Sequence, residues 1–191
     1  MENNIKRSII IPAYAEEDFI ASTLNALNEY LKNQDWLNST EVIVVTADAL
    51  DKTLDIVAEE IKKFPFGQHI KPGPRVGKGR DVKAGLSVSR GEYVLFMDAD
   101  MATPLAHLKT AFDDLKNGSD VTIGVRHINE MHKTLIRRLS SLFSNSLIRA
   151  FIGWNISDSQ CGFKGFNQKA LGIILPRSEI MGWGFDFEFI K

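Results

Sequence analysis

Cysteine is almost missing from this sequence, with Cys161 the only one among 191 residues. A single thiol excludes an internal disulfide and a zinc cluster built from cysteines. No apolar stretch approaches the roughly 18 residues that a bilayer-spanning helix needs. The first residues, Met1 to Arg7, lead straight into a predicted strand without the pattern of a signal peptide. We therefore expect a cytoplasmic protein.

An excess of charge of either sign is also lacking, because the formal net charge is -1. A domain that binds nucleic acid normally carries a strong positive balance, so we expect no nucleic-acid partner. With 44% hydrophobic and 25% charged residues, the composition is that of a globular domain with one good core. Any anion must then be bound by cations that the fold brings together locally.

The common phosphate-binding motifs are absent as well. Only three residues separate Gly73 from Gly77 and Lys78, and Gly79 stands where a P-loop has its Ser or Thr. The first strand is followed by no glycine-rich dinucleotide fingerprint. The loop nevertheless carries Arg75, Lys78 and Arg80, which can neutralise a diphosphate. A solvated basic turn is the alternative interpretation.

What the sequence does contain is a short apolar run, residues 93–97, that ends in two carboxylates. The run is typical of a strand buried on both faces. If the backbone stays extended, Asp98 and Asp100 project to the same side while Ala99 turns away. Two hard oxygen ligands at one point suit Mg²⁺ or Mn²⁺ bound together with a substrate diphosphate. A solvated turn after a strand is the alternative.

Strand and helix patterns alternate along the rest of the chain. The predicted strands cover residues 8–11, 41–46, 68–70, 93–97 and 120–125, and the predicted helices cover 16–32, 54–64, the stretch from the glycine-rich loop to about 90, and 104–117. This alternation predicts an α/β fold with a mostly parallel sheet covered by helices on both faces. Ligands of such sheets bind beyond the carboxyl ends of the strands. The polar residues at or just after those ends are Tyr14, Asp48, Lys78, Asp98 and Arg126.

Several blocks of the sequence resemble the family 2 glycosyltransferases. They are residues 10–17 (IIPAYAEE), 77–79 (GKG), 91–100 (GEYVLFMDAD) with 102–104 (ATP), 124–126 (GVR) and 157–164 (SDSQCGFK). Within that family they are most similar to the dolichyl-phosphate or polyprenyl-phosphate β-glucosyltransferases. The resemblance implies a Rossmann-like GT-A fold and an inverting transfer of a hexose, most simply glucose from UDP-glucose, to a lipid phosphate with the help of Mg²⁺ or Mn²⁺.

The resemblance also implies roles for individual residues. The implied donor-binding residues are Pro12, Tyr14, Glu16, Asp48, Lys78 and Asp98, and the implied metal ligands are Asp98 and Asp100. The candidates for the acceptor phosphate are Arg126, Arg138, Gln160 and Lys164, and the candidate catalytic acids are Asp98, Asp100, Asp158 and Asp186. Asp158 can orient the acceptor or a sugar hydroxyl, or it can cap the turn before Gly162. Asp186 lies in a block that closes the active site in this family, or in a last strand of alternating polarity.

Two positions depart from the family pattern. Ala15 stands where the family usually has Asn, and Ala47 replaces an Asp that commonly contacts the base. Asp48, one place later, is the candidate for rescuing that contact. Ala102 stands where the related mannosyltransferases often have Gln, which favours the glucosyltransferase branch.

Residues 131–152 have the pattern of a basic amphipathic helix, with Arg138 and Arg149 on one stripe. Such a helix can lie in a membrane interface, where a lipid phosphate is met, or it can pack on the sheet. The first interpretation predicts a peripheral protein at the cytoplasmic face of a membrane.

We expect a single catalytic domain over residues 1–191, with a nucleotide-sugar-binding half at 1–126 and an acceptor-side half at 127–191. Family members usually continue beyond this length, so a naturally short protein and a truncated one are both open. Two other function classes also stay open. A sugar nucleotidyltransferase would use the same acids and release pyrophosphate, and a non-catalytic nucleotide-sugar-binding module would agree with Ala15 and Ala47.

Overall fold

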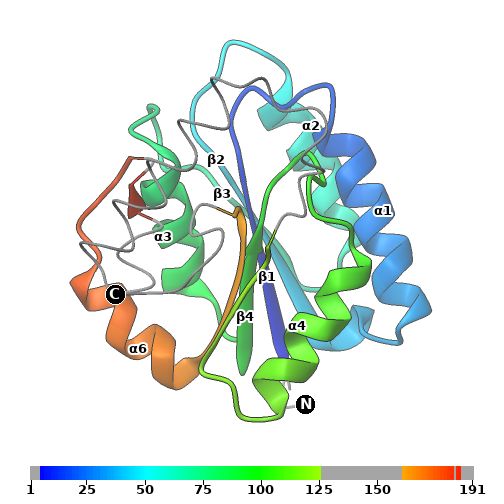
Figure 1. Ribbon diagram of the computed structural model, residues 1–191. Helices are drawn as coiled ribbons and strands as arrows, with labels where there is room; N and C mark the ends of the chain where they lie inside the picture. Colours follow the sequence, from blue (N-terminus) through cyan, green and yellow to red (C-terminus); the bar gives the residue numbers. More distant parts are fainter. Residues whose placement is uncertain (1–4, 126–160, 183, 186–191) are drawn as a thin grey trace, which may run out of the picture.

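The computed structural model describes residues 5–125, 161–182 and 184–185, which build one sheet with helices on both of its faces (Figure 1). The strands are β1 Arg7–Ala13, β2 Thr40–Thr46, β3 Gly67–Ile70, β4 Tyr93–Met97, β5 Val121–Ile123 and β6 Phe163–Asn167. The helices are α1 Ile20–Asn33, α2 Thr53–Glu60, α3 Lys78–Val88, α4 Ala106–Lys116 and α6 Gln168–Arg177, with short 3-10 turns at Leu37–Ser39 and Ile61–Lys63.

The described strands form a six-stranded sheet in the order β3-β2-β1-β4-β6-β5. The four strands from β3 to β4 are parallel, and in their register Ile10 lies opposite Ile43 on one side and Phe96 on the other. The strand β6 is inserted antiparallel between β4 and β5. The expected α/β fold with a mostly parallel sheet is therefore confirmed, while the predicted strand 120–125 is shorter and pairs antiparallel with β6.

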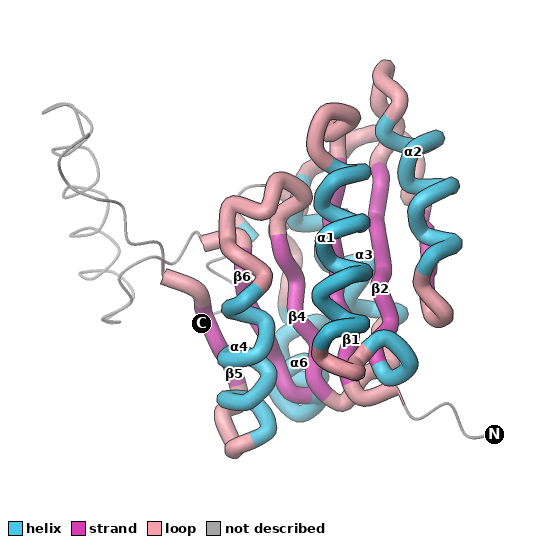
Figure 2. The backbone as a smooth tube through the Cα atoms, turned by 90° about the vertical axis from the view of Figure 1, so that its right-hand side faces the viewer, coloured by secondary structure: helices cyan, strands magenta, loops and turns pink. Residues whose placement is uncertain are grey.

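Two hydrophobic cores lie on opposite faces of the sheet. One face is covered by α1, α2 and α4, and the other by α3 and α6. Figure 2 shows α1 and α4 in front of the strands, with α3 and α6 behind them. In β4 the side chains alternate, since Leu95 joins the first core and Phe96 the second. Each such buried side chain contributes about 1.5–3 kcal/mol, and this burial fixes the register that places the strand ends.

The helices begin and end close to the predicted positions, with local reasons for the differences. The helix predicted from residue 16 begins at Ile20, because the chain first makes a turn in which Glu16 O accepts hydrogen bonds from Phe19 N and Ile20 N. Ala15 begins this turn with a φ of 55°. That left-handed conformation costs a residue other than glycine about 1–2 kcal/mol and is tolerated better by Asn, the residue that the family pattern has there.

The predicted membrane-facing helix at residues 131–152 lies outside the described residues. Among the helices that the structure does describe, none combines the length and the hydrophobicity needed to cross a bilayer.

Candidate functional site

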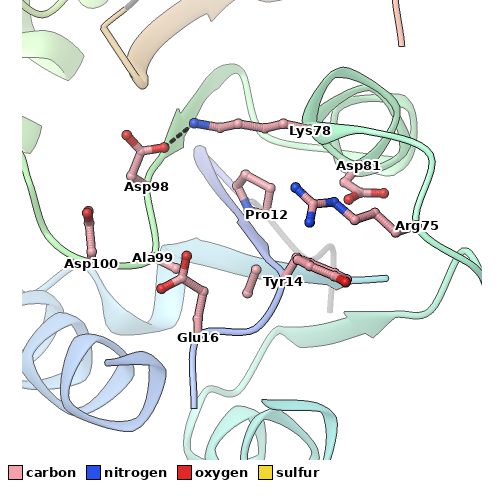
Figure 3. Close-up of a pocket in the computed structure, with 10 residues that line it drawn as sticks. Pro12, Tyr14, Glu16, Arg75, Lys78, Asp81, Asp98, Ala99 and Asp100 are labelled. Atoms are coloured by element: carbon pink, nitrogen blue, oxygen red, sulfur yellow. Dashed lines mark hydrogen bonds and ion pairs between the residues drawn. The ribbon is translucent and has the colours of Figure 1, made fainter. Parts of the chain in front are cut away.

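A pocket of about 260 Å³ lies at the carboxyl edge of the parallel strands, between the loops that follow β1, β3 and β4 (Figure 3). Its walls carry opposite charges and one aromatic ring. The lining residues are Pro12, Ala13, Tyr14, Glu16, Arg75, Lys78, Asp81, Asp98, Ala99 and Asp100. Six residues predicted from the sequence are thus brought together from three separate segments of the chain, namely Pro12, Tyr14, Glu16, Lys78, Asp98 and Asp100.

The two aspartates follow β4, but the backbone between them is not extended. The strand ends at Met97, residues 99 and 100 form a turn, and Met101 has a φ of 53°. The expectation of an extended strand end is therefore wrong. Ala99 is buried, and its carbonyl accepts a hydrogen bond from Thr23 Oγ1 at 2.5 Å, which anchors the turn to α1. The turn rather than the pleat directs both carboxylates to one pocket.

Each aspartate has a different partner. Asp98 forms an ion pair with the ammonium group of Lys78, which reaches across the pocket from the start of α3. Asp100 is exposed, and its Oδ1 accepts a hydrogen bond from Ala102 N at 2.9 Å. Asp100 therefore keeps a solvent-facing carboxylate, while Asp98 already has a cation beside it.

Glu16 completes an acidic corner of the pocket. Burial, followed by the negative charges of Asp100 and Asp98, raises the pKa of the Glu16 carboxyl, and the nearby Lys78 opposes that shift. The charges of Asp98 and Asp100 repel that of Glu16, so this corner is a region of negative potential. A divalent cation bound there would relieve this repulsion.

The donor set fits such a cation. Carboxylate oxygens are the hard ligands that Mg²⁺ and Mn²⁺ prefer. The described part of the chain contains no cluster of three or more His, Cys, Asp or Glu side chains arranged to hold a metal ion by themselves. Mg²⁺ is commonly bound through one or two carboxylates and completed by substrate phosphates, so Asp98 and Asp100 suit a metal that arrives with a diphosphate.

The opposite end of the pocket is aromatic and basic. The guanidinium carbon of Arg75 lies 3.8 Å from the centre of the Tyr14 ring, and Asp81 lies next to Arg75 (Figure 3). Arg80 donates to Asp81 Oδ1 from Nε at 3.1 Å and from Nη2 at 3.0 Å. A planar cation stacked on Tyr14 shows that this ring offers a face to a flat group.

The glycines beside Lys78 allow the close approach of another segment. A Cβ at Gly77 would lie 2.4 Å from Met181 O, and a Cβ at Gly79 would lie 2.6 Å from Ile180 O. Met181 O also accepts a hydrogen bond from Arg80 N at 3.1 Å. The N–H group of Arg80 is therefore already used within the protein, and the glycines serve packing against residues 180–182.

Another glycine supports the acidic corner. A Cβ at Gly162 would lie 1.9 Å from Asp98 Oδ2, so only a residue without a side chain leaves room for this carboxylate. The resemblance had drawn attention to the block around Gly162 but had given this glycine no role. Its place next to Asp98 is visible only in the folded protein.

Two predicted residues are placed differently from the others. Asp48 lies at the same edge but does not line the pocket, since it is exposed and its backbone N donates to Gly73 O at 3.0 Å. Lys164 is buried in β6, where its Nζ donates to Cys161 O at 2.8 Å. The predicted residues outside the described part of the chain are Arg126, Arg138, Asp158, Gln160 and Asp186.

Asp81 was missed by the sequence analysis. It lies on a helix rather than at a strand end, and it is three residues after Lys78, which places both on one helix face. The spacing of three residues from Lys78 is the sequence feature that could have identified Asp81 as a pocket residue.

A mixed α/β sheet with an acidic and basic pocket beyond the carboxyl ends of its parallel strands defines an α/β protein with a ligand site in the position usual for this class. Comparison with known sequences makes this specific. The chain belongs to glycosyl transferase family 2, whose sequence model matches residues 8–174.

Several curated relatives, from different organisms, are named dolichyl-phosphate beta-glucosyltransferase. A dolichyl-phosphate beta-glucosyltransferase of Trichomonas vaginalis is 30% identical over 96% of this chain and 60% of its own length. The proteins of that name from Dictyostelium discoideum and Saccharomyces cerevisiae are both 30% identical, over 98% and 99% of this chain and 62% and 63% of their own lengths. The chain therefore spans about 60% of the length of these relatives.

Solved structures confirm the GT-A fold. Glucosyl-3-phosphoglycerate synthase from Mycobacterium tuberculosis, in complex with Mn²⁺, UDP-glucose and phosphoglyceric acid, has a TM-score of 0.74 at 18% identity. The match covers 97% of this chain and 63% of that protein.

Proposed function

We propose that this protein transfers glucose, with inversion, from a nucleoside diphosphate-glucose to a dolichyl or polyprenyl phosphate. The observation that carries the proposal is the meeting of Tyr14, Lys78, Asp98 and Asp100 in one pocket at the carboxyl edge of the sheet. The names of the curated relatives support this donor sugar and this acceptor. The M. tuberculosis synthase, which has the same fold, was solved with UDP-glucose, and this supports UDP as the carrier.

The pocket suits the departure of a diphosphate. Asp98 and Asp100 are the residues that would hold Mg²⁺ or Mn²⁺, which supplies positive charge to the leaving nucleoside diphosphate. The Lys78 ammonium group lies in the same pocket and can bind diphosphate oxygens. Fixed positive charge that faces the leaving group stabilises it as the bond between the sugar and the diphosphate breaks.

The acceptor needs little activation. A phosphate monoester has a second pKa near ~6, so it is largely dianionic at neutral pH and attacks without a strong general base. Asp158 and Asp186 therefore stay predictions for orienting groups rather than required bases. Arg126, Arg138, Gln160 and Lys164 stay predictions for the acceptor phosphate.

We further propose that the protein works at the cytoplasmic face of a membrane through the helix predicted at 131–152. The support is the sequence pattern together with the lipid acceptor in the relatives' names. Flotation with anionic liposomes at low and high salt tests this proposal. Salt-sensitive binding that is reduced when Arg138 and Arg149 are both changed to Gln supports it, and equal flotation of the variant and the wild type contradicts it.

The function itself is tested by incubating the protein with radiolabelled nucleotide-sugars, Mg²⁺ or Mn²⁺, and polyprenyl phosphate. We expect label from UDP-glucose to move into the organic phase with release of UDP. In a parallel incubation with a nucleoside triphosphate and a sugar 1-phosphate, formation of a nucleotide-sugar with release of pyrophosphate would instead indicate a nucleotidyltransferase. Binding of the donor without turnover would indicate a non-catalytic module.

A further inference from the structure

Asp81 is an acidic side chain of the pocket that lies away from the proposed metal ligands (Figure 3). It lies in the first turn of α3 and is only 3% exposed. Figure 3 shows it beside Arg75 and Tyr14, across the pocket from Asp98 and Asp100. If the diphosphate lies at the acidic corner with the metal, Asp81 belongs to the end that receives the nucleoside.

The hydrogen bonds of Asp81 leave one oxygen for a ligand. Both bonds from the Arg80 guanidinium reach Oδ1, and no donor in the described part of the chain hydrogen-bonds Oδ2. Arg80 is itself held in place, since its Nη1 and Nη2 lie 3.4 Å from Pro72 O and 3.5 Å from Gly73 O. Asp81 is therefore a fixed acceptor in the pocket wall.

Burial raises the pKa of the Asp81 carboxyl, and the neighbouring Arg80 and Arg75 guanidinium groups oppose that rise. Oδ2 accepts no hydrogen bond from the described part of the chain, so a ligand N–H group at this point gains a charge-assisted hydrogen bond.

The neighbours of Asp81 match a nucleobase. The Tyr14 ring already stacks with a planar group, the Arg75 guanidinium, at 3.8 Å. A base that replaces the guanidinium on the Tyr14 ring would lie next to Asp81 (Figure 3). Asp48, the acidic residue expected at this end, does not line the pocket.

The chemistry of the edge decides which base fits. Uracil presents an N3–H donor between two carbonyl acceptors. The Asp81 carboxylate can therefore accept a hydrogen bond from N3–H, and a guanidinium can donate one to a carbonyl oxygen. Guanine also presents a ring N–H. Cytosine presents a lone pair at N3, which would face the negative charge of Asp81 and be repelled.

We propose that Asp81 selects the base of the donor by accepting its ring N–H, with uracil preferred over cytosine. The proposal rests on the proposed function, because it requires a nucleoside diphosphate in this pocket. Arg80 is a positioning residue that holds the carboxylate through Oδ1.

The test is calorimetric titration of the 191-residue chain with UDP and CDP in the presence of Mn²⁺. These ligands have the same ribose and diphosphate and differ only in the base. We expect the wild type to bind UDP at least about tenfold more tightly, the size of one charge-assisted hydrogen bond. In Asp81→Asn the side chain keeps its shape and can donate to cytosine N3, so the preference should fall below about threefold. The matched control Asp55→Asn, an exposed acid in the first turn of α2, should keep the wild-type preference.

A change on the ligand keeps the proposal testable if Asp81→Asn folds poorly. N3-methyl-UDP lacks the ring N–H and should bind the wild type at least about tenfold more weakly than UDP. Equal binding of UDP and CDP by the wild type, or an unchanged preference in a folded Asp81→Asn, overturns the role of Asp81 while leaving the proposed function standing. No binding of UDP by the wild type overturns both.

Discussion

Gly162 illustrates at the scale of one residue how the backbone leaves space for a carboxylate. Its missing side chain is what allows Asp98 Oδ2 to lie where a Cβ would be only 1.9 Å away. The obstructing atom is at the end of a side chain, so Gly162→Ala should fold while Asp98 rotates out of the pocket. We expect the binding of UDP with Mn²⁺ to weaken at least about tenfold, or ~1.4 kcal/mol.

Calorimetry together with thermal melting checks this prediction. The control is Gly172→Ala in α6, where a Cβ meets nothing within 4 Å and Ala favours the helix. Unchanged UDP affinity in a folded Gly162→Ala would show that the position of Asp98 does not matter for the ligand.

Glu16 gives the acidic corner a pH dependence. Its pKa is raised by burial and by Asp100 and Asp98, so the folded state binds this proton more tightly than the unfolded state does. Stability is therefore lost as pH rises from the unfolded pKa, about 4.3, through the raised folded pKa. Without metal, Glu16→Gln should be more stable than the wild type at pH 7, by less than about 1 kcal/mol because solvent screens the site.

Urea denaturation in EDTA at pH 7 and pH 4 measures this effect. The gain should vanish at pH 4, where the wild-type carboxyl is also largely protonated. The exposed acid Glu29, paired with Lys32 on the surface of α1, serves as the control and should give no gain when changed to Gln. A Glu16→Gln variant that is less stable than the wild type at pH 7 would contradict the repulsion.

Among the elements, α3 packs against the segment that follows α6. This contact connects the start of α3, where Lys78 lies, to the hydrophobic core on the face covered by α3 and α6. Gly79 faces Ile180 O and Phe185 Cβ, and Phe185 packs against Phe96 with ring centres 5.8 Å apart. Both obstructions at Gly79 are rigid, so Gly79→Ala must push the two elements apart. We expect a loss of about 1–3 kcal/mol, as for other overpacked sites.

Denaturant midpoints compare Gly79→Ala with Gly182→Ala, a glycine of the same segment whose added Cβ would meet nothing within 4 Å. Equal stability of the two variants would mean that this contact is not close in solution.

The elements that could be predicted from sequence are those with uninterrupted apolar patterns. The strands β1, β2 and β4 are buried on both faces, and their apolar runs indicated this directly. The strand β6 was missed because Lys164 and Gly165 interrupt its pattern. It exists because β4 and β5 both pair with it, and because Cys161 O accepts a hydrogen bond from the buried ammonium group of Lys164. Such tertiary pairing leaves no periodic signal in a short segment.

At the scale of the whole molecule, the location of the site followed from the topology. Parallel strands end at one edge, so residues after β1 and β4 were expected together, and Pro12, Tyr14, Asp98 and Asp100 do line one pocket. The turn at residues 99 and 100, the place of Gly162 and the nucleoside end formed with Asp81 could not be predicted. Each depends on contacts between loops that are distant in sequence.

The proposed function depends on a metal-assisted nucleotide site at Asp98 and Asp100. Calorimetric titration of UDP, with Mn²⁺ and with EDTA, into the wild type and Asp100→Asn tests this most directly. We predict that Mn²⁺ tightens UDP binding to the wild type at least about tenfold, and that most of this gain is lost in Asp100→Asn while the melting temperature stays close to that of the wild type. Equal UDP affinity in the two proteins, or no effect of Mn²⁺ on the wild type, would contradict it.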